Sequence, residues 1–433
     1  MAKEWRNWAG DQRCLPARVQ RPASRGELVE AVKRATEAGL TVRAVGAGHS
    51  FTDVACTGGL MLQFDRLDRV LDVDREAGLV KVEGGIGLRA LNETIWGYGL
   101  ALENLGDIDA QTVAGAVSTA THGTGSRFRN LSALIEGIEL VLPDGTLLEV
   151  SASERLELLP AVRVGLGALG VIATITFRTV PAFVIRRVDS PLPLAETLER
   201  LDDLADGSDH FEFYVFPHTE VALLRQSERT DEEPSPRGRL LEYGQEVVLE
   251  NWVIGTIARL GRRFPSRTPE FSRFVSSRIG KSTKVDRSYR VYASQRRVRF
   301  TEMEYAIPRR HAAEAVRSVL AAAERAGPPV GFPIEVRFVA GDDSWLSPSH
   351  DRDSCYIAVH QFEGMAWEPY FRSVEAIMDE FGGRPHWGKR HFQTAATLAE
   401  RYPHWNDFRA LRARLDPGGS FRNAYLDRVL GPV

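Results

Sequence analysis

The sequence lacks three features that would each assign it to a class of protein. It has only three cysteines, Cys14, Cys56 and Cys355, which are far apart and odd in number, so reduced thiols fit better than a disulfide framework or a zinc site. It has no uninterrupted run of about 18 apolar residues, so we expect no integral membrane segment. Its formal net charge is only −3, which gives no electrostatic reason to expect nucleic acid as a partner.

The first eight residues also lack the apolar stretch of a secretory signal, and together with the absence of a membrane-spanning run this predicts a cytoplasmic protein. Hydrophobic residues make up 43% of the chain and charged residues 26%, which is typical of a globular protein. A chain of 433 residues exceeds the size at which one hydrophobic core keeps growing, so we expect two domains.

The first 182 residues mix helical and strand patterns. Ser24 and Glu27 form a capping-box pattern before an amphipathic stretch, which predicts a helix over residues 25–38. Strands are predicted over 41–45, 79–83 and 171–180, with a helix over 88–98 and a hairpin whose strands, 138–142 and 146–150, flank Pro143-Asp144-Gly145. This mixture predicts an α+β domain over residues 1–182.

After residue 182 the pattern becomes that of an antiparallel sheet. Aromatic or alternating strands are predicted over 211–216 and 298–306, and an alanine-rich helix over 311–325. The polar segment 226–239, which contains two prolines, is predicted to be an exposed loop. A second α+β domain, built on an antiparallel sheet, is therefore expected.

Residues 44–53, Ala-Val-Gly-Ala-Gly-His-Ser-Phe-Thr-Asp, follow a predicted strand and carry a glycine turn. Gly46 and Gly48 allow positive φ and close approach, so that successive backbone N–H groups can hold a pyrophosphate with His49 beside the ligand. The alternative is a tight turn with an incidental histidine. The motif does not open a helix directly, which argues against a Rossmann dinucleotide fold.

Residues 112–125 consist almost entirely of small and hydroxyl side chains. Small side chains give up about 25 cal/mol of stabilisation for each Å² of apolar surface left unburied, so such a run needs a compensating role. Close approach to a large flat ligand is one such role, and a glycine-rich seam between packed helices is the alternative.

Four further motifs follow in order: residues 165–172 (GLGALGVI), 334–338 (IEVRF), 386–391 (HWGKRH) and 415–426 (LDPGGSFRNAYL). With the two glycine-rich segments, they resemble the vanillyl-alcohol oxidase superfamily, in particular its aldonolactone and alditol oxidase branch, which includes bacterial gulonolactone oxidases or dehydrogenases. The resemblance implies a two-lobed FAD-binding domain over residues 1–182. It also implies an antiparallel-sheet cap for the substrate over 183–402, and a segment over 403–433 that returns to the FAD-binding domain.

The resemblance further implies FAD bound covalently through His49. Because no cysteine lies in residues 112–125, we expect this histidine to be the single attachment point. The other residues expected to contact FAD are Val45, Gly46, Ala47, Gly48, Ser50, Phe51, Asp107, Thr112, Gly115, Ser118, Thr121, His122, Gly123, Val171 and Asn423.

The resemblance assigns the chemistry to three residues. Lys389 matches the lysine expected beside the substrate oxygen, where it stabilises alkoxide character. Arg337 matches the cation near the reduced flavin, and Glu335, two residues away on one side of a strand, orients it and binds substrate hydroxyls. A structural ion pair is the alternative. Substrate contacts are expected from Glu335, Arg337, His360 and Lys389, and the histidines at 360, 386 and 391 show no acidic partner at metal-ligand spacing.

These residues predict an FAD-dependent oxidoreductase that oxidises a CH–OH group of an aldonolactone or sugar-like polyol by hydride transfer. Oxygen, giving hydrogen peroxide, or another acceptor would reoxidise the flavin. The first alternative is oxidation of primary alcohols of alditols or of a sugar-bearing molecule such as a nucleoside. The second is a flavin-binding protein without turnover. The substrate, the acceptor and the oligomeric state stay open.

Overall fold

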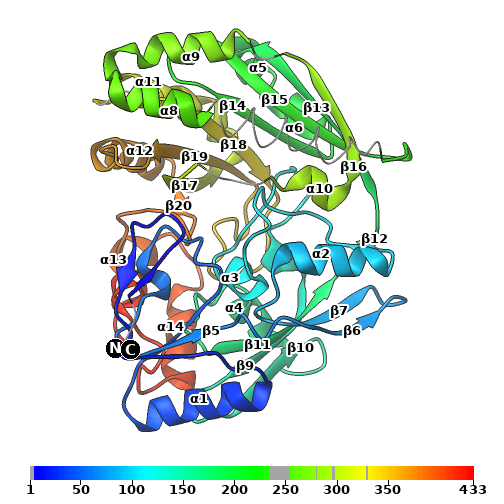
Figure 1. Ribbon diagram of the computed structural model, residues 1–433, viewed down its shortest axis with the longest axis vertical. Coiled ribbons are helices and arrows are strands. Elements are labelled where there is room, and N and C mark those ends of the chain that lie inside the picture. The colour runs from blue at the N-terminus through cyan, green and yellow to red at the C-terminus, as the bar shows by residue number, and fades with distance from the viewer. Residues whose placement is uncertain (1–3, 235–253, 279, 295–297, 328–329) are drawn as a thin grey trace.

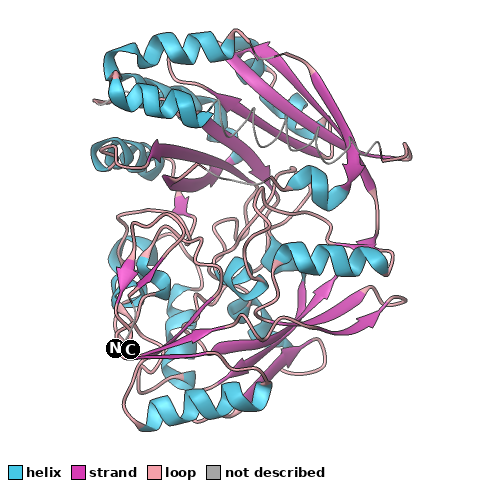
Figure 2. Cartoon of the chain, viewed as in Figure 1, coloured by secondary structure: helices cyan, strands magenta, loops and turns pink. Residues whose placement is uncertain are grey.

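Two lobes are stacked one above the other in the computed structural model, which describes residues 4–234, 254–278, 280–294, 298–327 and 330–433 (Figure 1). The lower lobe contains the N-terminal strands and the C-terminal helices, and the upper lobe is built on one large sheet (Figure 2). The α+β class predicted from the sequence is confirmed.

A five-stranded antiparallel sheet, in the order β10-β9-β11-β7-β6, forms the centre of the lower lobe. Its strands are β6 (Val70–Asp74), β7 (Leu79–Glu83), β9 (Ile135–Val141), β10 (Leu147–Ser151) and β11 (Val171–Arg178). The predicted hairpin and the strand at 79–83 are confirmed, and the predicted strand at 171–180 ends at Arg178.

A three-stranded parallel sheet, β3-β5-β4, lies beside the first one and consists of β3 (Arg18–Gln20), β4 (Val42–Val45) and β5 (Leu60–Gln63). Helix α1 (Arg25–Glu37) precedes β4, and the Ser24 hydroxyl accepts from the N–H of Glu27, as the capping pattern predicts. The Glu27 carboxylate reaches the N–H of Ala23 rather than that of Ser24. Strand β4 ends at Val45, so the glycine loop begins at the carboxyl end of this strand.

Shorter elements complete the lower lobe: β1 (Trp5–Arg6), β2 (Arg13–Cys14), η1 (Asp53–Ala55), α2 (Leu88–Gly97), β8 (Leu100–Ala101), α3 (Val113–Ser118), η2 (Leu131–Leu134), η3 (Leu156–Leu158), α4 (Leu159–Val162) and β12 (Val180–Pro181). Helices α13 (Ala395–Ala399), α14 (Trp405–Leu415) and α15 (Ala424–Leu430) bury their apolar faces in the same core as α2 and the five-stranded sheet. The chain therefore returns to the lower lobe at its end.

The upper lobe is an eight-stranded sheet in the order β16-β13-β15-β14-β18-β19-β17-β20, with every neighbouring pair antiparallel. Its strands are β13 (Val184–Pro193), β14 (His210–Val215), β15 (Val221–Thr230), β16 (Ser282–Arg287), β17 (Phe300–Pro308), β18 (Ile334–Val339), β19 (Ser354–Phe362) and β20 (Arg384–Pro385). The other elements are α5 (Leu194–Glu199), α6 (Leu201–Asp206), α8 (Ile254–Arg263), η5 (Pro265–Arg267), α9 (Thr268–Ser276), α10 (Ser288–Tyr292), η6 (Arg309–His311), α11 (Ala312–Arg325) and α12 (Glu368–Glu380).

The two faces of this sheet differ in composition. One face carries apolar side chains that pack against α11 and α12, for example Phe213, Val336 and Ile357. Residues one position away along each strand point to the other face, and these include Glu212, Arg337 and many further charged residues. The alternation therefore places a charged face opposite the apolar core of the upper lobe.

The predicted loop over residues 226–239 is wrong where it meets β15, because Gln226–Thr230 are paired with β13 on one side and β14 up to Ser227 on the other. Hydrogen bonding to two neighbours outweighs the polar composition of that segment. Residues 235–239 lie outside the described residues. The strands at 211–216 and 298–306 and the helix at 311–325 are confirmed with boundaries shifted by one to two residues.

Among the described residues, no helix is long and apolar enough to cross a membrane. All three cysteines are free thiols. The domain boundaries expected at residues 182 and 402 stay a prediction.

Candidate active site

A cleft opens in the lower lobe between the loop after β4 and helix α3, and it encloses about 960 Å³ of space, the solvent at its mouth included. Ten of the residues predicted to contact FAD line it: Val45, Gly46, Ala47, Gly48, His49, Ser50, Thr112, Gly115, Ser118 and Val171. The two glycine-rich segments, about 60 residues apart in the chain, therefore form opposite walls of one cavity.

The loop over residues 46–50 fits a large anionic ligand through its backbone. Gly48 has a φ of +70°, and a Cβ at Gly46 would overlap Oγ1 of Thr112 on the opposite wall. Within the described part of the chain, none of the backbone N–H groups of residues 47–50 donates to a protein acceptor. Successive unpaired N–H groups beside a glycine are suited to the pyrophosphate of FAD, so the residues present fit this cofactor.

His49 lies at the end of this loop and its ring stacks on that of Trp8, with 5.3 Å between the ring centroids. Burial, assisted by the positive charge of Lys389, lowers the pKa of His49 to about 4. The imidazole is therefore neutral near pH 7, with a nitrogen lone pair free for bonding.

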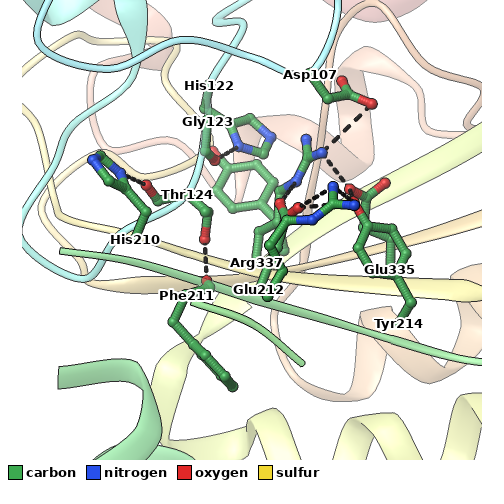
Figure 3. A network of polar contacts seen from close by, with 12 residues as sticks. Asp107, His122, Gly123, Thr124, His210, Phe211, Glu212, Tyr214, Glu335 and Arg337 are labelled. Carbon is green, nitrogen blue, oxygen red and sulfur yellow. Dashed lines mark hydrogen bonds and ion pairs between the residues drawn. The ribbon is translucent and has the colours of Figure 1, made fainter. Parts of the chain in front are cut away.

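The charged face of the upper sheet meets the lower lobe at Asp107, and Arg337 is the centre of its polar contacts (Figure 3). The guanidinium pairs with the carboxylates of Glu335, Glu212 at 3.0 Å and Asp107 at 3.5 Å. Burial would lower the pKa of Arg337, but these carboxylates outweigh it and raise the pKa well above its usual value. The phenol of Tyr214 donates toward the carboxylates of Glu335 and Glu212 at 2.8 and 2.9 Å, so the cation is held in one geometry.

Lys389 stands on the same boundary between the lobes. Its ammonium lies 2.5 Å from Oε2 of Glu302 and 5.3 Å from the centre of the Phe51 ring. Burial would lower the pKa of Lys389, but Glu302 and then Glu304 raise it above its usual value. Lys389, the predicted catalytic residue, is therefore a stable cation. Its positive charge lowers the pKa of His49, and the negative charge of Asp107 helps to raise the pKa of Lys389.

Two carboxylates that the sequence analysis did not select, Glu302 and Glu304, project from β17 toward these groups. Two acidic residues spaced by two within an otherwise apolar strand were the available signal, because that spacing puts both on one face. Glu304 pairs with Nε2 of His122 at 3.2 Å. Burial would raise the pKa of Glu304, but His122 outweighs it and holds the pKa far below its usual range.

His122, Glu304 and His386 have polar atoms that lie within 4.8 Å of one another, close enough to consider a metal ion. Their hydrogen bonds point to an internal network instead. Nδ1 of His122 faces the carbonyl of Gly123 at 2.8 Å, while Nδ1 of His386 accepts from the N–H of Gly388. With Nδ1 of His386 acting as an acceptor, its other nitrogen carries the proton, so the ring has no free lone pair for a metal.

A smaller cavity of about 370 Å³ adjoins Arg337. Asp107 and Gly123, both predicted to contact FAD, line this cavity together with Arg187, Arg225 and Tyr292. Asp107 and Gly123 therefore lie beside the charged face and do not line the cofactor cleft.

Four other predicted FAD contacts are not among the residues lining either cavity: Phe51, Thr121, His122 and Asn423. Phe51 packs in an aromatic cluster with Trp8 and Phe300. The Asn423 amide caps α15 and donates to three carbonyls of the turn at η1, which braces one wall of the cleft. Nε2 of His360, a predicted substrate contact, lies 3.6 Å from Glu302, behind Lys389.

Cleft residues that the sequence analysis did not select include Trp5, Phe64, Gln111, Gly170 and Ile172. Only Gly170 and Ile172 belonged to a recognised motif. The aromatic and amide side chains approach from separate segments and carried no local signal.

Comparisons with known proteins match both halves of this arrangement. The family described as "D-arabinono-1,4-lactone oxidase" matches residues 175–429, and the "FAD binding domain" family matches residues 16–151. An L-gulono-1,4-lactone dehydrogenase of Mycobacterium tuberculosis is 53% identical over the full length of both chains. An L-gulonolactone oxidase of Mus musculus is 35% identical, and an alditol oxidase of a Streptomyces species 32%, each over 98% of both chains. A solved structure, a solvent-stable cholesterol oxidase, has a TM-score of 0.82 over all of this chain and 98% of its own at 20% identity, a likeness in fold alone.

Proposed function

The chain belongs to the D-arabinono-1,4-lactone oxidase family, and on that premise we propose that its substrate is an aldonolactone or a related sugar-like polyol, bound between the two lobes. It is an FAD-dependent oxidoreductase that acts on CH–OH donors. The observation that carries the proposal is the charged face of the upper sheet, whose buried ions gather at the boundary with the lower lobe. Buried carboxylates and cations on one face can bind several hydroxyl groups at once.

FAD, when bound in the cleft, supplies a hydride acceptor for the carbon that carries the hydroxyl group. In this proposal Lys389 hydrogen bonds the reacting oxygen and stabilises its negative character. Arg337 provides positive charge beside the ring that gains electrons, and Glu335 holds Arg337 and accepts from substrate hydroxyls. The burial of all three groups strengthens these interactions because water competes less.

We further infer that His49 bonds FAD covalently. Its neutral imidazole at the edge of the cleft supports this, since an attacking nitrogen needs a free lone pair. Protein grown with ample riboflavin should stay yellow after acid precipitation, and the mass of the chain should include one FAD. A bare chain mass would contradict the attachment.

The substrate class is tested by mixing the oxidised holoprotein anaerobically with gulonolactone, galactonolactone, xylitol and a nucleoside. We expect bleaching of the flavin absorbance to be fastest with a lactone. Faster bleaching with xylitol or the nucleoside would favour the alternative substrates, and no bleaching with any of them would leave a flavin-binding protein without turnover. Repeating the reaction with oxygen and with a dye identifies the acceptor.

The cytoplasmic location is also a proposal, supported by free thiols at Cys14, Cys56 and Cys355. Cell fractionation followed by detection of the covalently bound flavin tests it. Recovery with the periplasmic or membrane fraction would contradict it.

A further inference from the structure

Glu302 is a buried carboxylate for which the proposed function gives no role. It lies on β17, and its neighbour on the facing strand β19 is His360. Its side chain is only 6% exposed. A charged group this buried is retained only with compensating partners, and Glu302 has one on each carboxylate oxygen.

The two partners lie on opposite sides of the carboxylate. Oε2 accepts from the ammonium of Lys389 at 2.5 Å, and Oε1 lies 3.6 Å from Nε2 of His360. The three groups therefore form a line that begins where the substrate oxygen is proposed to bind. The line ends at the ring of His360, whose side chain is 11% exposed to solvent.

Hydrogen bonding shows where a proton can be added in this line. Nδ1 of His360 lies 3.3 Å from the carbonyl oxygen of Pro333, which can only accept, so Nδ1 carries the ring proton. In the neutral ring Nε2 then carries a lone pair, which faces the ionised carboxylate of Glu302. Their separation of 3.6 Å is longer than a hydrogen bond, and one added proton would join them.

We propose that Glu302 relays the substrate hydroxyl proton from Lys389 to His360, an inference that rests on the proposed function. Lys389 passes one of its protons to Oε2 of Glu302, and the lone pair that this leaves on its nitrogen takes the substrate proton as the O–H bond breaks, so that a new N–H bond replaces the one given up. A half-turn of the carboxyl group presents that proton to Nε2 of His360. The O–H electron pair becomes the second bond of the carbonyl, and the C–H pair leaves with the hydride, so the substrate is oxidised and the flavin reduced.

The charges around Glu302 favour passing a proton on over holding it. Burial would raise the pKa of Glu302, but the positive charge of Lys389 outweighs it and holds the pKa below its usual value. A proton that reaches Glu302 therefore moves on, and Lys389 ends the step as a cation. The alternative is a structural ion pair that only keeps Lys389 in place.

The experiment compares Glu302→Gln and His360→Gln with Glu363→Gln, a change at an exposed glutamate just beyond β19. Flavin reduction is followed anaerobically in mixtures of water and D₂O at one pH. In the unchanged protein we expect the rate to fall along a curve as the share of D₂O rises, because more than one proton moves along the relay. Glu302→Gln should slow reduction by about 10²–10³-fold, the usual worth of a general base, and His360→Gln by about tenfold, and both should lose this curvature.

Covalent flavin should be retained in all three variants, and Glu363→Gln should match the unchanged protein. A slow Glu302→Gln variant that keeps the full curvature in mixtures of water and D₂O would overturn the relay in favour of a structural pair, as would unchanged rates. Partial rescue by Glu302→Asp, which restores a carboxylate, is the expected counter-check.

A substrate-free measurement separates this inference from the proposed function. With ¹⁵N-labelled histidine in the holoprotein, the ring signals of neutral His360 should show a proton on Nδ1 and none on Nε2. A neutral ring with its proton on Nε2 would overturn the relay even if lactones reduce the flavin. The expected tautomer in a protein that no polyol reduces would instead place the failure in the proposed function.

Discussion

The cofactor cleft and the charged face of the upper sheet are built by different means. The cleft walls are largely backbone and small side chains from loop 46–50 and α3, and its selectivity is one of shape. The charged face uses long ionised side chains from β14, β17 and β18, and its selectivity is electrostatic. Changes in the cleft should therefore alter how much flavin is held, whereas changes on the charged face should alter how fast it is reduced.

The largest effect is expected from Lys389→Ala, which removes the cation beside the proposed substrate oxygen. Flavin reduction should slow by about 10³-fold or more, because both stabilisation of the oxygen and proton movement are lost. Bound flavin should stay near one per chain, since Lys389 does not line the cleft. Stopped-flow absorbance measures the rate, with the exposed Lys281→Ala as control; equal rates in the two variants would refute the role of Lys389.

A change in the cleft should lower the amount of bound flavin and leave the reduction rate of the flavin that does bind unchanged. In Gly46→Ala the new Cβ overlaps Oγ1 of Thr112, so the walls must shift apart and flavin content should fall by about tenfold. In Gly58→Ala the new Cβ meets nothing within 4 Å, which makes it the matched control. Absorbance and mass of the purified proteins report occupancy. If the Gly46→Ala fraction that does carry flavin were reduced much more slowly, the division between shape and charge would fail.

Arg337→Lys keeps the charge of the face but not its geometry. A lysine cannot span Glu335, Glu212 and Asp107 at once as the forked guanidinium does, so the rate of flavin reduction should fall by about 10–100-fold. Arg325→Lys, on the exposed end of α11, is the control. A rate within about twofold of the control would mean that charge alone suffices.

The smallest effect concerns acid stability. His386 and His391 are buried near the lobe boundary with pKa values lowered, by burial first, to about 3. Below the unfolded value near 6.5 the unfolded chain binds more protons, so stability falls as pH drops toward 4, by about 1.4 kcal/mol per pH unit for each such group. His391→Gln should flatten this slope in urea unfolding at pH 4–6. The half-buried His311→Gln should keep it, and equal slopes would contradict the assignment.

Local sequence predicted the cleft well for a physical reason. A strand that ends in Gly-Ala-Gly and a run of small side chains constrain the backbone by themselves, so loop 46–50 and the segment from Thr112 to Ser118 could be identified without any partner. Asp107 and Gly123, which were also expected to contact FAD, line the smaller cavity beside Arg337, and their contact with the cofactor stays a prediction.

The sequence by itself determined the glycine loops, the alternating strands and the position of His49, because each depends on neighbours within a few residues. Tertiary structure alone decided that Glu302 and Glu304 meet Lys389 and His122. Those contacts require β17 to pair with β19 and the lower lobe to present residues 122 and 389 to the same face. Pairing between strands far apart in the chain brings buried charges together, and no local pattern specifies which partner each charge will find.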